Sequence, residues 1–138
     1  FRPLLVAYAL LFNLRLDWSF YDSRATILYQ PVGIFSLLSL RWPGLTGIQA
    51  LILLATFSGT FYVAGFYRKV LGPLFTAAIF LLDGYHNMFG FIDAQIHMVF
   101  FLGALNCMDW SGNEPLFKNK AFRFCEVVFI LVYFHSGI

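Results

Sequence analysis

The sequence predicts an all-α protein: a polytopic transmembrane helix bundle of about five spanning helices with one short interfacial helix. Its 138 residues are 60% hydrophobic and only 12% charged, whereas soluble domains carry about 25% charged residues. The mean hydropathy of +0.76 points the same way. A chain this short has too few polar side chains to cover the surface of a soluble fold. We therefore expect a single domain over residues 1–138, with lipid as the solvent of its apolar faces.

Long apolar runs place the helices in order, because a hydrocarbon layer of about 30 Å needs about 20 helical residues. The first run is short and the last reaches Ile138 without a terminating signal, so truncation at both ends is expected. Residues 31–40 are too few to span, and they predict an interfacial or re-entrant helix. The five predicted spans are residues 3–14, 45–67, 70–82, 88–107 and 121–138.

The distribution of Lys and Arg between the two ends of these spans predicts the orientation in the membrane. Six of them fall on the side expected to be cytoplasmic: Arg2, Arg68, Lys69, Lys118, Lys120 and Arg123. Three fall on the other side: Arg15, Arg24 and Arg41. Five aromatic residues of that outer side suit an interfacial belt: Trp18, Tyr21, Tyr29, Trp42 and Tyr85. A bacterial inner membrane is the expected location.

Composition also argues against several functional classes. A net charge of +2 without a basic run gives no reason to expect nucleic-acid binding. A soluble enzyme does not fit the hydropathy, and a transporter is disfavoured by the lack of an inverted repeat. Cys107 and Cys125 have neither metal-binding nor redox spacing. The lipid bilayer is the expected partner, with other membrane-protein subunits as further candidates.

Ionisable residues in or beside the spans form the candidate catalytic site. Such residues cost roughly 2.5–3.5 kcal/mol each in a span, so they face the interior of a bundle. The topology brings four of them to one membrane level on the non-cytoplasmic side, together with the amide side chain of Asn87: His86, Asp93, His97 and His135. Asp93 and His97 are four residues apart and share a helix face, an arrangement that suits general acid–base chemistry. The alternative is a buried pair that only ties helices together.

Four aromatic residues are candidate walls of a cofactor site. The four are Phe89, Phe91, Trp110 and Tyr133, whose rings could stack on a quinone or another lipid-soluble molecule. Haem ligation by two of the three histidines is a less favoured alternative. No metal site is predicted, because no recognised ligand spacing is present.

Seven short motifs follow one another in a recognisable order along nearly the whole chain. They are Phe1-Arg2, Tyr29-Gln30, Arg41-Trp42-Pro43, Gly65-Phe66-Tyr67-Arg68, Tyr85-His86-Asn87, Asp109-Trp110-Ser111 and the stretch from Val132 to Ile138. This order resembles the HTTM domain, the membrane part of vitamin K-dependent gamma-glutamyl carboxylases and their bacterial relatives. The Tyr-Phe-x-x-Gly pattern at Tyr133–Gly137 is the most specific part of the resemblance.

The resemblance implies an active site at the outer membrane face. In carboxylases of that family a reduced quinone is oxygenated, and the resulting base removes a proton from a glutamate side chain. The family's proposed base is a lysine that would follow Ile138, and the family's Asn-Asn-His turn reads Tyr85-His86-Asn87 here. Two functions follow: an HTTM enzyme or enzyme-like protein that binds a quinone or lipid, or a non-catalytic accessory subunit of a bioenergetic or pigment-binding membrane complex. Whether the chain is an enzyme stays open.

Overall fold

The structure, a computed structural model, describes residues 2–31, 34–89, 96–111, 123 and 127. Within these residues the chain is all-helical and contains no strand, which confirms the predicted class. The helices are α1 (Arg2–Arg15), α2 (Trp18–Leu28), α3 (Ile34–Leu37), α4 (Gly44–Ala64), α5 (Arg68–Asn87) and α6 (Ile96–Ser111).

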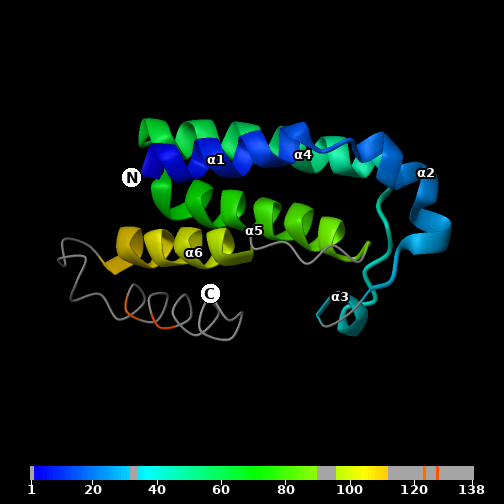
Figure 1. Ribbon diagram of the computed structural model, residues 1–138. Coiled ribbons are helices and arrows are strands. Elements are labelled where there is room, and N and C mark those ends of the chain that lie inside the picture. Colours follow the sequence, from blue (N-terminus) through cyan, green and yellow to red (C-terminus); the bar gives the residue numbers. More distant parts are fainter. Residues whose placement is uncertain (1, 32–33, 90–95, 112–122, 124–126, 128–138) are drawn as a thin grey trace.

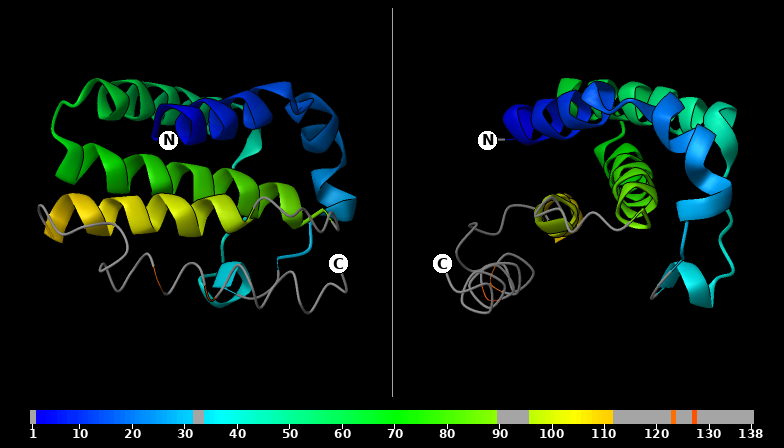
Figure 2. Two further views of the ribbon diagram at one scale, coloured as in Figure 1. Left: turned by 60° about the vertical axis from the view of Figure 1, so that its left-hand side comes forward. Right: turned by 45° about the vertical axis from the view of Figure 1, so that its right-hand side comes forward.

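Helix α5 is the centre of the bundle. It packs against α4 on one side and α6 on the other, and α1 lies alongside α4 (Figures 1 and 2). The start of α1, the end of α4, the start of α5 and the end of α6 therefore meet at one end of the molecule, here called the Arg2 end. The opposite end holds α2 and the last turns of α5, and is called the His86 end.

A tight turn joins α4 to α5 and makes them antiparallel. Gly65 adopts a left-handed backbone with φ of 94° and closes α4, a role that glycine fills without a Cβ clash. Its N–H bonds the carbonyl of Tyr62, and the N–H of Phe66 bonds that of Phe61. Tyr67 is also left-handed, with φ of 40°, so the chain reverses within three residues and α5 begins at once.

The core lies between α4 and α5. Its largest fully buried apolar side chains are Tyr62, Phe75, Ile48, Ile79 and Leu82. Small residues on α4 allow close approach of the neighbouring helices. A Cβ built on Gly59 would lie 2.9 Å from the Phe75 ring and 3.1 Å from Val6, so α1, α4 and α5 meet at this glycine.

Gly72 provides a matched test of this close packing. A Cβ there would collide with Asn106 Oδ1 and lie 2.9 Å from the Tyr62 ring, whereas Gly103 has nothing within 4 Å among the described residues. We expect Gly72→Ala to destabilise by about 1–3 kcal/mol, although alanine is the better helix former. Gly103→Ala should be neutral or stabilising by up to about 1 kcal/mol. Unfolding of both variants in mixed micelles, followed by circular dichroism, measures the difference; equal stabilities would contradict the packing at Gly72.

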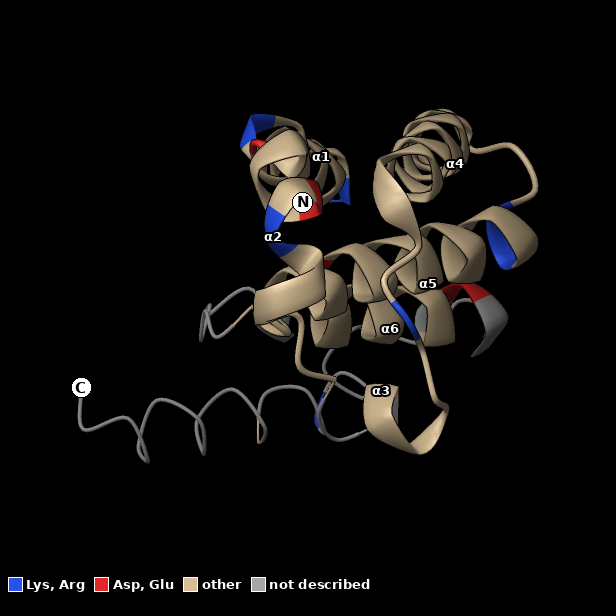
Figure 3. Ribbon diagram, turned by 90° about the vertical axis from the view of Figure 1, so that its right-hand side faces the viewer, with Lys and Arg blue, Asp and Glu red and all other residues tan. Residues whose placement is uncertain are grey.

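Among the described residues, one helix is long and apolar enough to cross a membrane, and that helix is α4. It contains no Lys, Arg, Asp or Glu (Figure 3). The expectation of five spans is not confirmed. Helices α1 and α6 have only 14 and 16 residues, α5 carries Arg68, Lys69 and Asp83, and the predicted fifth span lies almost wholly outside the described residues.

Several predicted boundaries differ from the observed ones. The polar segment 15–30 contains helix α2, which begins after Asp17 because the Asp17 carboxylate accepts from the Phe20 N–H. Residues 83–87 were expected to form a turn but complete α5, with Asn87 as its last residue. Helix α6 continues to Ser111, four residues beyond the predicted end of the span at residue 107. The short helix α3 falls within the predicted interfacial segment.

Candidate functional site

The last two turns of α5 carry buried polar side chains at the His86 end. Asp83 and His86 are only 4% and 5% exposed, and Asn13 of α1 is 2% exposed. Burial of such groups is costly unless they are hydrogen-bonded. These three buried residues therefore need hydrogen-bond partners inside the bundle.

His86 is hydrogen-bonded to Tyr21 of α2. The His86 Nε2 and the Tyr21 hydroxyl lie 3.0 Å apart in buried surroundings. Three rings surround the imidazole: the edge-on rings of Phe12 and Trp18, at centroid distances of 6.0 and 6.4 Å, and the Tyr21 ring at 5.3 Å. A histidine beside a phenol can accept or return a proton, so this pair is the described group best suited to proton transfer.

Asn13 links α1 to Asp83 of α5 and to Trp18 of α2, which both lie near His86. Its amide nitrogen donates to Asp83 Oδ1 at 3.1 Å and to the Ala9 carbonyl at 3.0 Å. The indole N–H of Trp18 donates to the Asn13 carbonyl at 2.9 Å. Asn13 Oδ1 is buried and has no hydrogen-bond partner among the described residues. The network thus ties α1, α2 and α5 together at one level.

A second layer of aromatic rings closes the His86 end. Trp42 contacts Trp18, Tyr85 and Phe89, with ring centroids 5.2–6.4 Å apart, and its indole N–H donates to Asp22 at 2.7 Å. The Tyr29 hydroxyl donates to the Leu40 carbonyl at 3.0 Å. Burial, together with nearby Tyr85, raises the pKa of Tyr29 to about 12. The Tyr29 hydroxyl therefore keeps its proton, and its hydrogen bond, well above neutral pH.

The structure brings together some of the predicted site residues. His86 and Asn87 share the last turn of α5, and Phe89 follows within two residues and contacts Tyr21. The backbone of His97 lies in the first turn of α6. Asp93, Phe91, Tyr133 and His135 lie outside the described residues, so their membership of the site stays a prediction.

Trp110 is placed differently from the expectation. It follows Asp109 in the last turn of α6, and Asp109 binds Arg2 and Tyr62. The backbone of Trp110 is therefore at the Arg2 end, a bundle length away from His86.

Trp18 and Tyr21 were assigned to an interfacial belt, but both are buried against His86. Their three-residue spacing is the sequence signal for a shared helix face. The signal becomes visible only when residues 18–28 are recognised as a helix. Asp83 and Asn13 were not assigned to the site, although both are buried beside it.

A separate polar network occupies the Arg2 end. Asp109 Oδ1 is 2.6 Å from the Arg2 guanidinium, and its other oxygen accepts from the Tyr62 hydroxyl at 2.9 Å. The Arg2 guanidinium also lies over the Tyr62 ring at 5.1 Å. Nearby, the Asn106 amide donates to Thr76 at 2.7 Å, which joins α6 to α5. These contacts satisfy a carboxylate that is mostly buried.

Within the described ranges, no group of three or more His, Cys, Asp or Glu residues could hold a metal ion. In the part of the chain that the structure describes, fold and site define a class: an all-helical protein with one helix apolar enough to span a membrane and a buried His–Tyr pair inside the bundle. Comparison with protein-family models, curated proteins and solved structures found no match to this chain.

Proposed function

We propose that this chain is an integral membrane protein, a bundle of about five spanning helices whose His86 end binds a quinone or a related lipid-soluble ring. The observation that carries the membrane location is an inverted distribution of polarity. Leu53 and Phe57 of α4 are 71% and 58% exposed, and Leu4 and Leu11 of α1 are likewise exposed. Asn13, Asp83, His86 and Asn106 are buried. Lipid favours this arrangement and water opposes it.

The ends of the bundle support an orientation. Arg2, Arg68 and Lys69 gather at the Arg2 end, which we place in the cytoplasm by the positive-inside rule. The His86 end then lies on the non-cytoplasmic side, and we propose a bacterial inner membrane. The resemblance to the HTTM domain supports the same side for the site, and carboxylase-like chemistry is the reaction that this resemblance would imply.

The quinone proposal rests on the chemistry of the His86 end. A quinone presents two carbonyl oxygens and a flat ring, so it needs hydrogen-bond donors and aromatic walls. The Tyr21–His86 pair supplies a donor with an adjacent proton acceptor. Trp18, Trp42 and Phe89 supply rings around it. The predicted residues Phe91 and Asp93 follow Phe89 directly in the sequence.

Tryptophan fluorescence tests the quinone site. In a Trp110→Phe background the signal comes from Trp18 and Trp42, and a short-chain quinone bound against them should quench it saturably. Tyr21→Phe or His86→Leu removes one hydrogen bond worth about 1 kcal/mol, so the Kd should rise about fivefold. The control is Tyr8→Phe, which makes the same change at a half-exposed tyrosine of α1 and should leave the Kd unchanged. Unsaturable quenching, or equal effects of Tyr8→Phe and Tyr21→Phe, would contradict the site.

A second candidate function is supported by a different observation. The Tyr21 hydroxyl and His86 Nε2 already satisfy one another, and the exposed apolar side chains of α1 and α4 offer a broad surface to another membrane protein. The chain would then be a non-catalytic accessory subunit of a larger membrane complex. Gentle extraction from the native membrane, followed by native-gel sizing, separates the two functions. Migration with a large complex favours the subunit, and a small particle that binds quinone favours the first proposal.

A further inference from the structure

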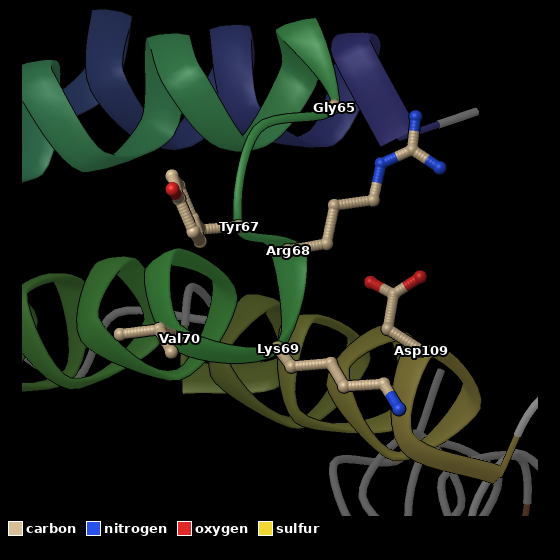
Figure 4. Close-up of a pocket in the computed structure, with 6 residues that line it drawn as sticks. All are labelled: Gly65, Tyr67, Arg68, Lys69, Val70 and Asp109. Carbon is tan, nitrogen blue, oxygen red and sulfur yellow. The ribbon is translucent and has the colours of Figure 1, made fainter.

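Helix α4 presents one side to the exterior of the bundle, while α1 and α5 pack against its other sides (Figure 3). Exposed side chains follow one another on that outer side at alternating spacings of three and four residues, the spacing of the seam between two helices of a coiled coil. They are Thr46, Gln49, Leu53, Thr56 and Thr60, here called the Gln49 stripe. The stripe ends with the helix, because the chain leaves α4 at Gly65 and turns through Tyr67 and Arg68 into α5 (Figure 4).

The composition of the Gln49 stripe does not suit a helix side that meets lipid. Four of its five side chains are polar, and Leu53 is the exception. Polar side chains in a membrane span are expected to face a protein neighbour, where they can form hydrogen bonds between helices. The stripe therefore indicates a second helix packed against the outer side of α4, and Leu53 would pack against the same neighbour.

Gln49 is the member of the stripe that most needs such a neighbour. Among the described residues its amide has no hydrogen-bond partner. By contrast, the hydroxyls of Thr56 and Thr60 donate to carbonyls of their own helix at 2.8 and 2.7 Å. Gln49 lies five residues after Gly44, which is about 8 Å along the helix axis. In a hydrocarbon core of about 30 Å this depth places the amide below the headgroups, where water does not satisfy it.

A second copy of this chain is the neighbour that these features fit. An amide both donates and accepts, so the Gln49 side chains of two copies can bond one another. Membrane insertion gives all copies the same direction, and two parallel α4 helices related by a twofold axis place each stripe residue opposite itself. Helix α4 contains no Lys, Arg, Asp or Glu, so this pairing brings no like charges together within the span.

We propose that α4 pairs with α4 of a second copy through the Gln49 stripe, and that the chain forms a parallel homodimer in the membrane. This inference rests on the proposed membrane location, but neither on the quinone site nor on the accessory-subunit function. The dimer gives the Gln49 amide the hydrogen bonds that lipid cannot supply.

Energy transfer between fluorescent copies measures the pairing. Full chains with a donor or an acceptor dye at the N-terminus are reconstituted together in phosphatidylcholine vesicles, and transfer is followed as lipid dilutes the protein. Gln49→Leu should weaken the dimer about tenfold, because it removes the hydrogen bonds between the two helices. Gln49→Asn keeps an amide and should stay within about threefold of the native chain. The matched control, Gln30→Leu, makes the same change at an exposed position outside the helices and should change the affinity by less than about twofold.

Disulfide formation locates the contact. In a background of Cys107→Ser and Cys125→Ser, either Gln49→Cys or Leu53→Cys should link two copies under a lipid-soluble oxidant, because residues near a twofold axis meet their own equivalents. Leu11→Cys, on an exposed part of α1, is the control and should not link them.

Each other outcome overturns a stated part. A chain that enters the vesicles but stays monomeric would assign the stripe to lipid and overturn only this inference. Equal effects of Gln49→Leu and Gln30→Leu, or equal linking by Leu11→Cys, would overturn the stripe as the interface. Linking of Gln49→Cys in the native membrane solely to a different protein would overturn the second copy. A chain that stays outside the vesicles and is soluble without detergent would overturn the membrane location itself.

Discussion

Asn13→Asp is expected to destabilise the folded bundle by about 3–5 kcal/mol, because it creates a buried charge without a counter-ion. In the native chain the Asn13 amide donates to Asp83 Oδ1 at 3.1 Å, and both side chains are almost completely buried. A carboxylate at position 13 would face the carboxylate of Asp83 at this distance. It would also lose the donor that bonds the Ala9 carbonyl.

The measurement is the free energy of unfolding of the purified chain, from titration of mixed micelles with a denaturing detergent. Gln30→Glu is the control, since it makes the same amide-to-acid change at an exposed position outside the helices and should cost no more than about 0.5 kcal/mol. If Asn13→Asp were as stable as this control, the contact between α1 and α5 would be wrong.

Asp109→Ala is expected to be the second most damaging change, at about 2–4 kcal/mol. It leaves the Arg2 guanidinium without its carboxylate and removes the acceptor of the Tyr62 hydroxyl. The value lies at or below the range for fully buried ion pairs because the Arg2 side chain is 22% exposed. The same unfolding measurement applies, and the loss should appear as an earlier transition without a change in its steepness.

A double-mutant cycle distinguishes this ion pair from general packing. Arg2→Gln combined with Asp109→Asn removes both charges, and the double variant should be less damaged than the sum of the two single variants. Additive effects would mean that the residues do not interact. Tyr62→Phe should account for about 1 kcal/mol of the loss, because it removes one hydrogen bond and leaves the ring in place.

The helix boundaries show where sequence reasoning succeeds and where it fails. Residues 45–67 were expected to span, and α4 covers Gly44–Ala64. The helix ends there because Gly65, which has no Cβ, takes the left-handed conformation that closes it. Residues 83–87 fell between two predicted spans, 70–82 and 88–107, and so were expected to turn. They remain helical, since Asp83 and His86 find their partners inside the bundle. Tertiary contacts here overrode the local preference.

The identities of the polar partners could not be read from the sequence. Topology places Asn13, Asp83 and His86 at one level, but not the pairing of Asn13 with Asp83 or of His86 with Tyr21. Arg2 and Asp109 are 107 residues apart, and no local pattern connects them. Such pairs depend on the rotation and axial position of each helix, which packing determines.

The sequence by itself determined the all-helical class and the apolar helix α4. Composition and apolar run length are enough for these features, because they depend on each segment separately. Only the tertiary structure decided which face of α4 is buried and which side chains meet. Since α4 has no charged residue and carries polar side chains on both its buried and its exposed sides, hydrophobicity cannot indicate which face is buried. The close contact of Gly59 with Phe75 and Val6 indicates the buried face, because an added Cβ would lie 2.9 Å from the Phe75 ring.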